Sequence, residues 1–234
     1  MGILSNNDNN LNDEMVTNFY FPTSKSALII FTKNPELGKC KTRLAKTIGD
    51  QAALEVYKDL LNHTASIAGK VSVDRFVFYS KSIQKNDVWD SNIFRKKLQQ
   101  GNDLGVKMEN AFLDLFQMGY EKIVIIGSDL PDLETNHITS AFESLNINEA
   151  VLGPALDGGY YLLGLSKMHD FIFRNKPWSQ SNLLEETFME LKNNKVSFIT
   201  LETLNDIDTF KDLATSKYYN SNMELQQKIR QLNG

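Results

Sequence analysis

Cysteine and histidine are both scarce in this chain of 234 residues, and each shortage excludes a kind of site. The single cysteine, Cys40, has no partner for an internal disulfide and cannot build a cysteine-rich zinc site. The three histidines lie far apart in the sequence and form no H-x-x-x-H pair. We therefore expect them on the surface or on helix faces rather than around a metal ion.

Long apolar runs and N-terminal targeting signals are also lacking. No run approaches the roughly 18 apolar residues that a membrane-spanning helix requires. The opening MGILSNNDNNLNDE has neither the cationic nor the apolar region of a secretory signal. Asn6 stands where a myristoylation signal needs Ser or Thr. These absences predict a cytoplasmic protein without a membrane partner.

An excess of basic charge is absent as well, because 25 Lys and Arg face 29 Asp and Glu, for a formal net charge of -4. Nucleic-acid binding usually requires a broad basic face, so we expect no nucleic-acid partner. The hydrophobic content of 41% is that of an ordinary globular protein. A local cluster of basic residues in such a chain points to a small anionic ligand.

The composition changes near residue 25. Residues 1–24 are rich in Asn and Asp and poor in apolar side chains, which predicts a flexible N-terminal tail. The remaining residues, 25–234, are enough for one sizeable α/β core. We expect them to form a single domain.

Strand and helix patterns alternate along this domain. SALIIFT (26–32), DRFVFYS (74–80) and EKIVIIGSD (121–129) are short apolar runs typical of buried strands. Helical spacing predicts helices between them, the first of them capped by Asp50. This alternation predicts an α/β fold with a mainly parallel sheet covered on both faces. Two strands joined across LDGG would make the sheet mixed.

Two short segments carry finer expectations. The pattern of residues 84–97 is ambiguous, and we expect a short helix there before KLQQG. Asp208 has the side chain of a helix N-cap, so we expect it to begin a short helix through Phe210 and Leu213.

The stretch FTKNPELGKCKTRLAKTIG (31–49) follows the first predicted strand and is strongly basic, with Glu36 as its one acidic residue. Its basic residues are Lys33, Lys39, Lys41, Arg43 and Lys46. Ligands of open α/β sheets bind beyond the carboxyl ends of the strands, so this cluster predicts a phosphate site. Arg43 can bind two phosphate oxygens at once. The alternative is a solvated surface loop with stray charges.

The same stretch resembles a Walker A loop only superficially. That motif is G-x-x-x-x-G-K-[ST], and here Cys40 follows Gly38 and Lys39, while Lys33 stands where the first glycine is required. A loop with so few glycines cannot surround a phosphate with backbone N–H groups in the same way. We expect it to bind phosphate through side chains, and a P-loop NTPase is disfavoured.

Acidic residues follow other predicted strands. Asp129 ends EKIVIIGSD, where a carboxylate can hold Mg²⁺ or Mn²⁺ between phosphate oxygens. Asp129 and Asp132 could alternatively cap the next helix, a role that suits Asp132 better. Near the C-terminus, Asp206 and Asp208 are further candidates, although Asp208 is equally a good N-cap.

The segment GPALDGGYYLLGL (153–165) places Asp157, Gly158 and Gly159 before a predicted strand. The glycines permit a close approach of backbone to substrate, and a plain hairpin turn explains them equally well. A hairpin does not readily explain Asp157, so we regard these three residues as candidates for binding an acceptor substrate.

Six motifs occur in an order that resembles a bacterial family of GT-A-fold transferases. They are FTKNPELGKCKTRL, QQGNDLGVKM, GSDLPDL, GPALDGGYYLLGL, PWS and DIDTFKDL, which together span about residues 26–215. The family is described as selenodomain-associated or glycosyltransferase-like. It is similar to 2-phospholactate guanylyltransferase and, more distantly, to the molybdenum cofactor guanylyltransferase. The resemblance implies a GT-A-like, three-layer α/β/α sandwich of the nucleotide-diphospho-sugar transferase type.

The resemblance also implies roles for individual residues. It assigns the nucleotide and its phosphates to Phe31, Lys33, Lys41 and Arg43, and the base to Gln100, Gly101 and Leu104. It makes Asp129 the first ligand of Mg²⁺ or Mn²⁺, with Asp208 or Asp157 as the second. Lys41, Arg43 and Asp129 would then form the catalytic set. Lys107 stands where the family often has Arg, which weakens any two-oxygen phosphate contact at that position.

We therefore expect a metal-dependent transferase that uses a nucleoside triphosphate or a nucleotide sugar and a small-molecule acceptor. The first interpretation is nucleotidyl transfer from the triphosphate to a phosphorylated small molecule. The second is glycosyl transfer from a nucleotide sugar to a hydroxyl. A third is a nucleotide-binding protein without catalytic activity, since a fold alone does not fix function.

Overall fold

The computed structural model describes residues 22–233, so most of the predicted tail, residues 1–21, lies outside the described part. A seven-stranded sheet, in the order β3-β2-β1-β4-β6-β5-β7, forms the centre of the molecule. Its strands are β1 (Ser26–Thr32), β2 (Asp74–Tyr79), β3 (Arg95–Leu98), β4 (Lys122–Ile126), β5 (Ala150–Pro154), β6 (Tyr160–Leu165) and β7 (Phe198–Thr200). All neighbours pair in parallel except β6, which is antiparallel to both β4 and β5. The mixed, mainly parallel sheet predicted from the sequence is thus confirmed.

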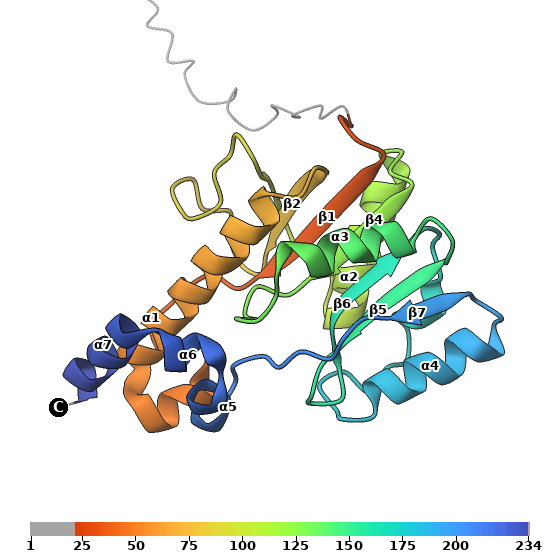
Figure 1. Cartoon of the computed structure of the whole chain (residues 1–234). Helices are drawn as coiled ribbons and strands as arrows, with labels where there is room; N and C mark the ends of the chain where they lie inside the picture. The colour runs from red at the N-terminus through yellow and green to blue at the C-terminus, as the bar shows by residue number, and fades with distance from the viewer. Residues whose placement is uncertain (1–21, 234) are drawn as a thin grey trace, which may run out of the picture.

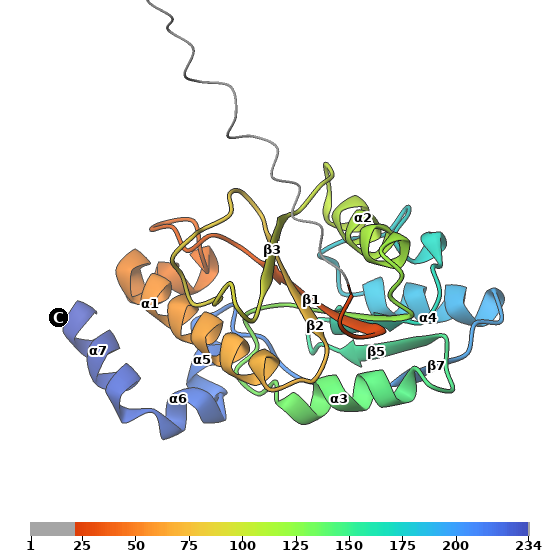
Figure 2. The same cartoon turned by 90° about the horizontal axis from the view of Figure 1, so that it is seen from above.

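Helices cover both faces of this sheet. α1 (Thr42–Gly69) and α3 (Thr135–Ser144) lie on one face, and α2 (Leu104–Gln117) and α4 (Leu183–Asn193) lie on the other, as Figures 1 and 2 show. A single 3₁₀ turn, η1 (Asp170–Ile172), precedes α4. The side chains of β1 alternate between the two layers, which is the period of a strand buried on both sides. No helix within residues 22–233 is long and apolar enough to cross a membrane.

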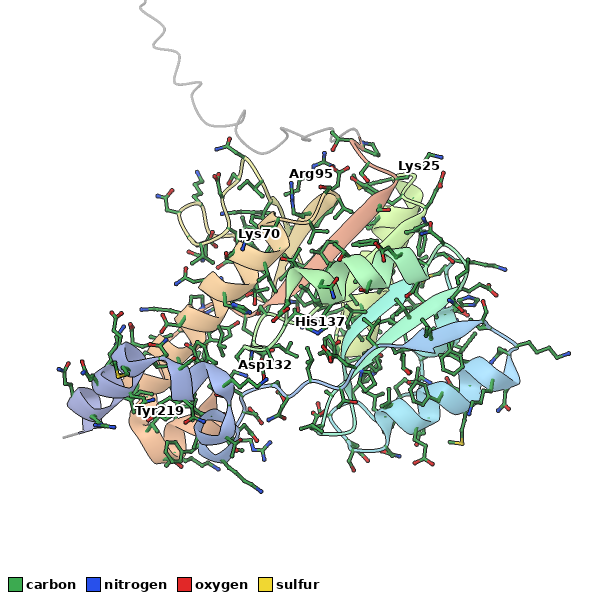
Figure 3. All side chains as sticks on the ribbon, in the orientation of Figure 1. Lys25, Lys70, Arg95, Asp132, His137 and Tyr219 are labelled. Atoms are coloured by element: carbon green, nitrogen blue, oxygen red, sulfur yellow. The ribbon has the colours of Figure 1, made fainter. Side chains whose placement is uncertain are left out.

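Three C-terminal helices pack against the first half of α1 rather than against the sheet (Figure 1). They are α5 (Phe210–Thr215), α6 (Lys217–Ser221) and α7 (Met223–Asn233). An extended linker, residues 201–209, joins them to β7. Leu204 in this linker exchanges backbone hydrogen bonds with Pro154 and Leu156 at 3.1 Å each. On the other side His137 of α3, labelled in Figure 3, contacts Glu202 of the linker. The linker is therefore fixed beside the loop that joins β5 and β6.

The start of α1 corrects one prediction. The helix begins at Thr42, before Asp50. Gly49 (φ 77°, ψ 158°) has a non-helical backbone, which puts a kink in the helix without ending it. Asp50 thus marks the restart of the helix after a kink. As a consequence Arg43 and Lys46 lie on the first turns of α1, outside the loop in which the sequence placed them.

Two further expectations are wrong. Residues 84–97 form turns and then β3, with no helix, and Trp89 and Phe94 pack edge to face at 5.2 Å where a helix was expected. Asp208 does not cap α5: the cap is Thr209, whose side chain accepts a hydrogen bond from the Asp212 N–H. Asp208 is one residue too early for this role, which leaves its carboxylate free to face Arg43.

Candidate active site

The loop between β1 and α1 is fixed at its base by buried hydrogen bonds. The Asn34 side chain donates to the Ser82 carbonyl at 2.8 Å and accepts from the Lys81 N–H at 3.1 Å. The Lys33 N–H donates to the Tyr57 hydroxyl, which in turn donates to the Lys33 carbonyl, both at 3.0 Å. The backbone of this loop is thus held firmly, while the Lys33 side chain extends into solvent.

The five basic residues of the stretch do not act together. Lys39 and Lys81 both bind the Glu36 carboxylate, at 2.6 and 2.8 Å. The hydrogen bond from Lys39, joined by that from Lys81, lowers the pKa of Glu36 to about 2. Lys39 is therefore already neutralised within the loop, and the charges that face the rest of the site are those of Lys41 and Arg43.

Lys41 is the buried cation of the site. Its backbone is left-handed (φ 49°), which is uncommon for a residue with a side chain and is a form of local strain. Its side chain is 6% exposed, and Nζ lies 2.7 Å from Oδ2 of Asp129. Burial by itself lowers the pKa of Lys41, but the attraction of Asp129, Asp206 and Asp208 outweighs it and raises this pKa. Lys41 thus carries its charge at any ordinary pH.

Arg43 makes the second contact between the basic and acidic segments. Nη1 lies 2.6 Å from Oδ2 of Asp208, and the Arg43 side chain is 66% exposed. Ile207, beside Asp208, is buried against α1, and burial of such a side chain contributes about 1.5–3 kcal/mol. This apolar contact positions the linker so that its carboxylates face the start of α1.

Asp206, which the sequence offered together with Asp208 as a further candidate, lies in the site. It lines the same cavity as Asp129 and Asp157. Burial, followed by repulsion from Asp129, raises the pKa of Asp206 to about 6, although Lys41 opposes the shift. A signal was available in the sequence: in an extended segment residues i and i+2 point to the same side, so Asp206 accompanies Asp208 while Ile207 points to the core.

Asp157, Gly158 and Gly159 form the tight loop between β5 and β6. The Gly159 N–H donates to Oδ1 of Asp157 at 2.9 Å. Gly158 has φ 89°, and a Cβ there would lie 2.0 Å from the carbonyl oxygen of Ser181. Only glycine fits at this position, because the loop packs directly against the chain before α4. The glycines thus form a turn, and that turn places Asp157 and Gly159 on the cavity wall. The acceptor-binding role stays a prediction.

The cavity, about 220 Å³, lies beyond the carboxyl end of β4. Three carboxylates line it, those of Asp129, Asp157 and Asp206, and none of the lysines and arginines within residues 22–233 does. Ser179 and Gln180 complete its polar wall. Ser179 ends the PWS segment, which the sequence offered as a motif without a role, and Gln180 directly follows it. The strand order places β1 between β2 and β4, so the site occupies the switch point where α/β sheets bind ligands.

Tyr57 links the ends of β1 and β4 behind this cavity. Besides its bonds to Lys33, its hydroxyl lies 3.5 Å from Oγ of Ser128 and from Oγ1 of Thr32. Ser128 directly precedes Asp129. Tyr57 therefore holds the base of the basic loop and the base of the Asp129 loop in one hydrogen-bonded network. The helical spacing of Tyr57 predicts only that its side chain lies in the core. The sequence does not show which groups its hydroxyl contacts.

The predicted base-binding residues are not all brought together. Phe31 and Leu104 line a small apolar cavity that also borders the acidic one through Leu104. Gln100 instead lines a separate cavity of about 510 Å³ near β3. Gly101, with φ 136°, forms the turn before α2, and a Cβ there would lie 2.7 Å from the Val106 side chain. Gly101 thus has a conformational reason to be glycine, and Gln100 lies apart from Phe31.

The acidic residues allow a test of whether a divalent cation fits. Within residues 22–233, no three His, Cys, Asp or Glu side chains are arranged to hold a metal ion by themselves. Asp129 and Asp208 each bind a cationic side chain, and the pKa of Asp206 is raised first by burial and then by repulsion from Asp129. Mg²⁺ is commonly held by one or two carboxylates together with substrate phosphates and water. The residues present therefore fit a cation that arrives with a nucleotide.

Comparison with solved structures defines the class of fold. A protein of Desulfovibrio desulfuricans G20, provisionally named a nucleotide-diphospho-sugar transferase, is 28% identical with a TM-score of 0.79; the match covers 89% of this chain and 98% of that chain. The 4-diphosphocytidyl-2C-methyl-D-erythritol synthase of Anaerococcus prevotii DSM 20548 is 11% identical with a TM-score of 0.52, over 84% and 96% of the two chains. A cytidylyltransferase of Leptospira borgpetersenii is 12% identical with a TM-score of 0.51, over 89% and 96%. The last two likenesses show the fold alone.

The fold is thus that of the nucleotide-diphospho-sugar transferases and cytidylyltransferases, as the sequence predicted. The chain belongs to the family DUF2064, described as an uncharacterized protein conserved in bacteria, whose pattern matches residues 63–180. A search of curated proteins finds no match. The expectation of a transferase is confirmed at the level of these structural neighbours. The similarity to 2-phospholactate guanylyltransferase stays a prediction.

Proposed function

We propose that this protein is a metal-dependent transferase that takes a group from a nucleotide donor. One observation carries the proposal: Lys41 and Arg43, after β1, contact Asp129 and Asp208, after β4 and β7. A phosphate chain placed between these segments would meet cations from one side. It would also meet carboxylates able to share a metal ion on the other.

Lys41 and Arg43 are the residues best placed for the donor phosphates. Both cations already lie at the sheet edge beside the acidic cavity, where Lys41 is paired with Asp129 and Arg43 with Asp208. Charge-assisted hydrogen bonds to phosphate are the strong class of such bonds, and Arg43 can use two nitrogens of its guanidinium. Lys33 contributes its backbone to the Tyr57 network, and its exposed side chain is free to reach an outer phosphate.

Asp129 and Asp206 are the carboxylates best placed for the metal ion. Asp208 and Asp157 were the second ligands that the resemblance suggested, but Asp208 is engaged by Arg43, and Asp206 lines the cavity beside Asp129. When bound, Mg²⁺ or Mn²⁺ would neutralise phosphate oxygens as charge develops on them. Asp129 would then exchange its partner from the Lys41 ammonium to the metal, which leaves Lys41 free to bind phosphate.

The first form of the reaction is nucleotidyl transfer. An oxygen of a phosphorylated acceptor would attack the α-phosphorus in line, the bond to the β-phosphate oxygen would break, and pyrophosphate would leave. Lys41 and Arg43 would stabilise the charge that moves onto the leaving group, which is the main contribution a protein makes to phosphoryl chemistry. No residue of the site needs to form a covalent intermediate.

The second form is glycosyl transfer from a nucleotide sugar to a hydroxyl. One observation favours it: the cavity beside Asp129 is lined by three carboxylates and, in the part of the chain that the structure describes, by no lysine or arginine, which suits an uncharged acceptor. An acceptor hydroxyl would attack the anomeric carbon, and the nucleoside diphosphate would leave with its charge balanced by the same cations. Asp157, the third carboxylate that lines the cavity, is placed to take the hydroxyl proton.

A thermal-shift panel of nucleoside triphosphates and nucleotide sugars, each with and without Mn²⁺, tests the proposal. A stabilisation by triphosphates alone would select nucleotidyl transfer, and one by nucleotide sugars would select glycosyl transfer. In both cases the shift should require the metal ion. If no nucleotide raises Tm, with or without metal, the proposal fails. Binding without turnover in an acceptor screen would instead favour a non-catalytic nucleotide-binding protein.

A further inference from the structure

The segment between η1 and α4, residues 173–182, contains the PWS motif and lines the acidic cavity through Ser179 and Gln180. Both residues are exposed to solvent, and none of the hydrogen bonds within residues 22–233 uses either side chain. Cavities that bind small molecules carry a few polar groups that are free to pair with the ligand. The hydroxyl of Ser179 and the amide of Gln180 are groups of this kind.

The backbone of Ser179 has a conformation that a side chain disfavours. Its φ is 64°, and the Gln180 N–H donates to the Pro177 carbonyl at 3.0 Å, so Ser179 is the third residue of a tight turn. Glycine or asparagine usually occupies this place when φ is positive, because a Cβ there comes too close to the following carbonyl oxygen. Residues held in such conformations cluster at binding and catalytic sites. Serine at this position therefore points to a role in binding.

Four residues other than glycine have a positive φ within residues 22–233, and they allow a comparison. Lys41 already belongs to the site, and Ser179 lines its cavity. Asn175 is of a type that tolerates this conformation well. Lys195, with φ 56°, follows the far end of α4 and does not line the cavity. Lys195 is therefore a matched control for strain without a site.

Close packing fixes this segment in place. A Cβ on Gly105, at the start of α2, would lie 2.6 Å from Nε1 of Trp178, and Gly158 is in equally close contact with Ser181. Gly105 belongs to QQGNDLGVKM, Trp178 to PWS and Gly158 to GPALDGGYYLLGL. Three of the six sequence motifs thus meet at this segment. Their contacts keep the turn of residues 177–180 on the cavity wall.

The polar groups on this side of the cavity match hydroxyl groups. The Ser179 hydroxyl and the Gln180 amide can each donate and accept a hydrogen bond, and Asp157 accepts. Oδ1 of Asp157 already holds the Gly159 N–H, which leaves Oδ2 for a ligand. A ligand hydroxyl both donates and accepts, so it can pair with all three side chains, whereas a phosphate dianion only accepts. None of the three is a residue that we assign to the metal ion or to the donor phosphates.

We propose that Ser179 and Gln180 bind the acceptor substrate, and that this acceptor carries two or more hydroxyl groups, as a polyol or a sugar does. The hydroxyl that reacts lies at Asp157, and a second one is held by Ser179 and Gln180. The strained turn is retained because it places these two side chains on the cavity wall, where they orient the acceptor. This inference rests on the proposed transferase function in its glycosyl form.

Glycerol is a suitable probe, because it has several hydroxyl groups and no stereocentre that could mismatch the site. Propan-1-ol, with a single hydroxyl, and glycerol 3-phosphate are its matched analogues. Dissociation constants are measured by ligand-observed NMR on the full chain, without nucleotide or metal. We expect saturable binding of glycerol to the wild type and at least about tenfold weaker binding of propan-1-ol, which lacks the second contact. Glycerol 3-phosphate should bind no more tightly than glycerol.

Two variants of Ser179 separate ligand binding from backbone strain. Ser179→Gly and Ser179→Ala both remove the hydroxyl, so each should weaken glycerol binding about 3–10-fold, the effect of one hydrogen bond. Only glycine relieves the backbone, so Ser179→Gly should melt about 2–4 °C above Ser179→Ala. Lys195→Gly relieves the same strain away from the cavity. It should raise Tm and leave glycerol binding unchanged.

Three outcomes overturn the proposal: no saturable binding of glycerol, tighter binding of glycerol 3-phosphate, or wild-type affinity for glycerol in both Ser179 variants. Equal Tm values for the two variants would show that the turn is not strained at Ser179, and that part of the proposal would fail. The nucleotide panel described above is independent of these measurements. If nucleotides bind with metal but glycerol does not, only the acceptor assignment fails. If glycerol binds and no nucleotide does, the transferase function fails instead.

Discussion

The two cation–carboxylate contacts of the site have the same chemistry and nearly the same length, but different surroundings. Lys41 lies 2.7 Å from Asp129 with its side chain 6% exposed, whereas Arg43 lies 2.6 Å from Asp208 with its side chain 66% exposed. Exposed pairs contribute about 0–1 kcal/mol, because water screens them. Loss of one partner of a buried pair costs more, because the remaining charge is left without solvent or partner. The buried pair therefore contributes more to the stability of the site than the exposed pair does.

The largest effect on stability should follow from breaking the buried pair. Asp129→Asn leaves the Lys41 ammonium buried without its nearest carboxylate. Because Asp129 is itself 36% exposed, we expect the free energy of unfolding to fall by about 3 kcal/mol, at the lower end for buried pairs. Urea denaturation measures this change. A fall of less than about 1 kcal/mol would mean that the Lys41–Asp129 pair contributes no more than an exposed pair, and the two pairs would then not differ in energy.

Arg43→Ala should affect ligand binding far more than stability. If Arg43 binds donor phosphate, its loss weakens binding of the responding nucleotide by about 1.5–3 kcal/mol, the range for hydrogen bonds to charged groups. The free energy of unfolding should change by less than about 1 kcal/mol, because the pair with Asp208 is exposed. Calorimetric titration and denaturation of the same sample give both values. Nucleotide affinity within error of the wild type would make Arg43 an ordinary surface residue.

Asp206 should give the site a pH dependence. Its pKa is raised from 3.8 to about 6, so the folded state binds this proton more tightly than the unfolded chain does. The stabilisation is fully present below about pH 4 and is lost as the pH rises through about 6. Allowing for solvent screening, we expect a loss of roughly 1–2 kcal/mol across this range. Binding of Mg²⁺ with nucleotide should change in the opposite direction and strengthen as Asp206 ionises.

Asp206→Asn is the matched test of this pH dependence. Its unfolding free energy, measured by denaturation between pH 4 and 7, should lack the decline that the wild type shows. If the variant and the wild type follow the same profile, another group is responsible and the electrostatic description of the acidic cavity is wrong.

The smallest effect belongs to Asp208→Asn. The exposed pair with Arg43 is worth about 0–1 kcal/mol, and Thr209 rather than Asp208 caps α5, so no cap is lost. We expect a change in Tm close to experimental error. A large drop would show that Asp208 supports the linker directly and that the two pairs are energetically alike.

Most of the fold was readable from the sequence because its strands are buried on both faces. Runs such as SALIIFT have no helical period and are bounded by polar residues, so their identification needs little tertiary information. The edge strand β3 was missed, since Arg95, Lys96 and Lys97 give it neither apolar alternation nor a continuous apolar run. The kink at Gly49 was missed for a different reason, because the helical spacing of the apolar residues begins only after Asp50 and does not show that the chain is helical before it as well.

The candidate site was only partly readable. Lys41, Arg43 and Asp129 could be singled out because each follows a strand end, and parallel strands bring their ends together. Asp206 could not be ranked in this way. Its importance comes from its burial and from charged neighbours that are distant in sequence. Both are properties of packing, and no local pattern records them.

The central claim is that Lys41 and Asp129 belong to one metal–nucleotide site. Calorimetric titration of the nucleotide selected by the thermal-shift panel, with and without Mg²⁺, onto the wild type and Asp129→Asn tests it most directly. We predict that Mg²⁺ strengthens binding to the wild type at least about tenfold and has no effect on the variant. Equal metal dependence in the two proteins would contradict the claim and move the metal ion away from Asp129.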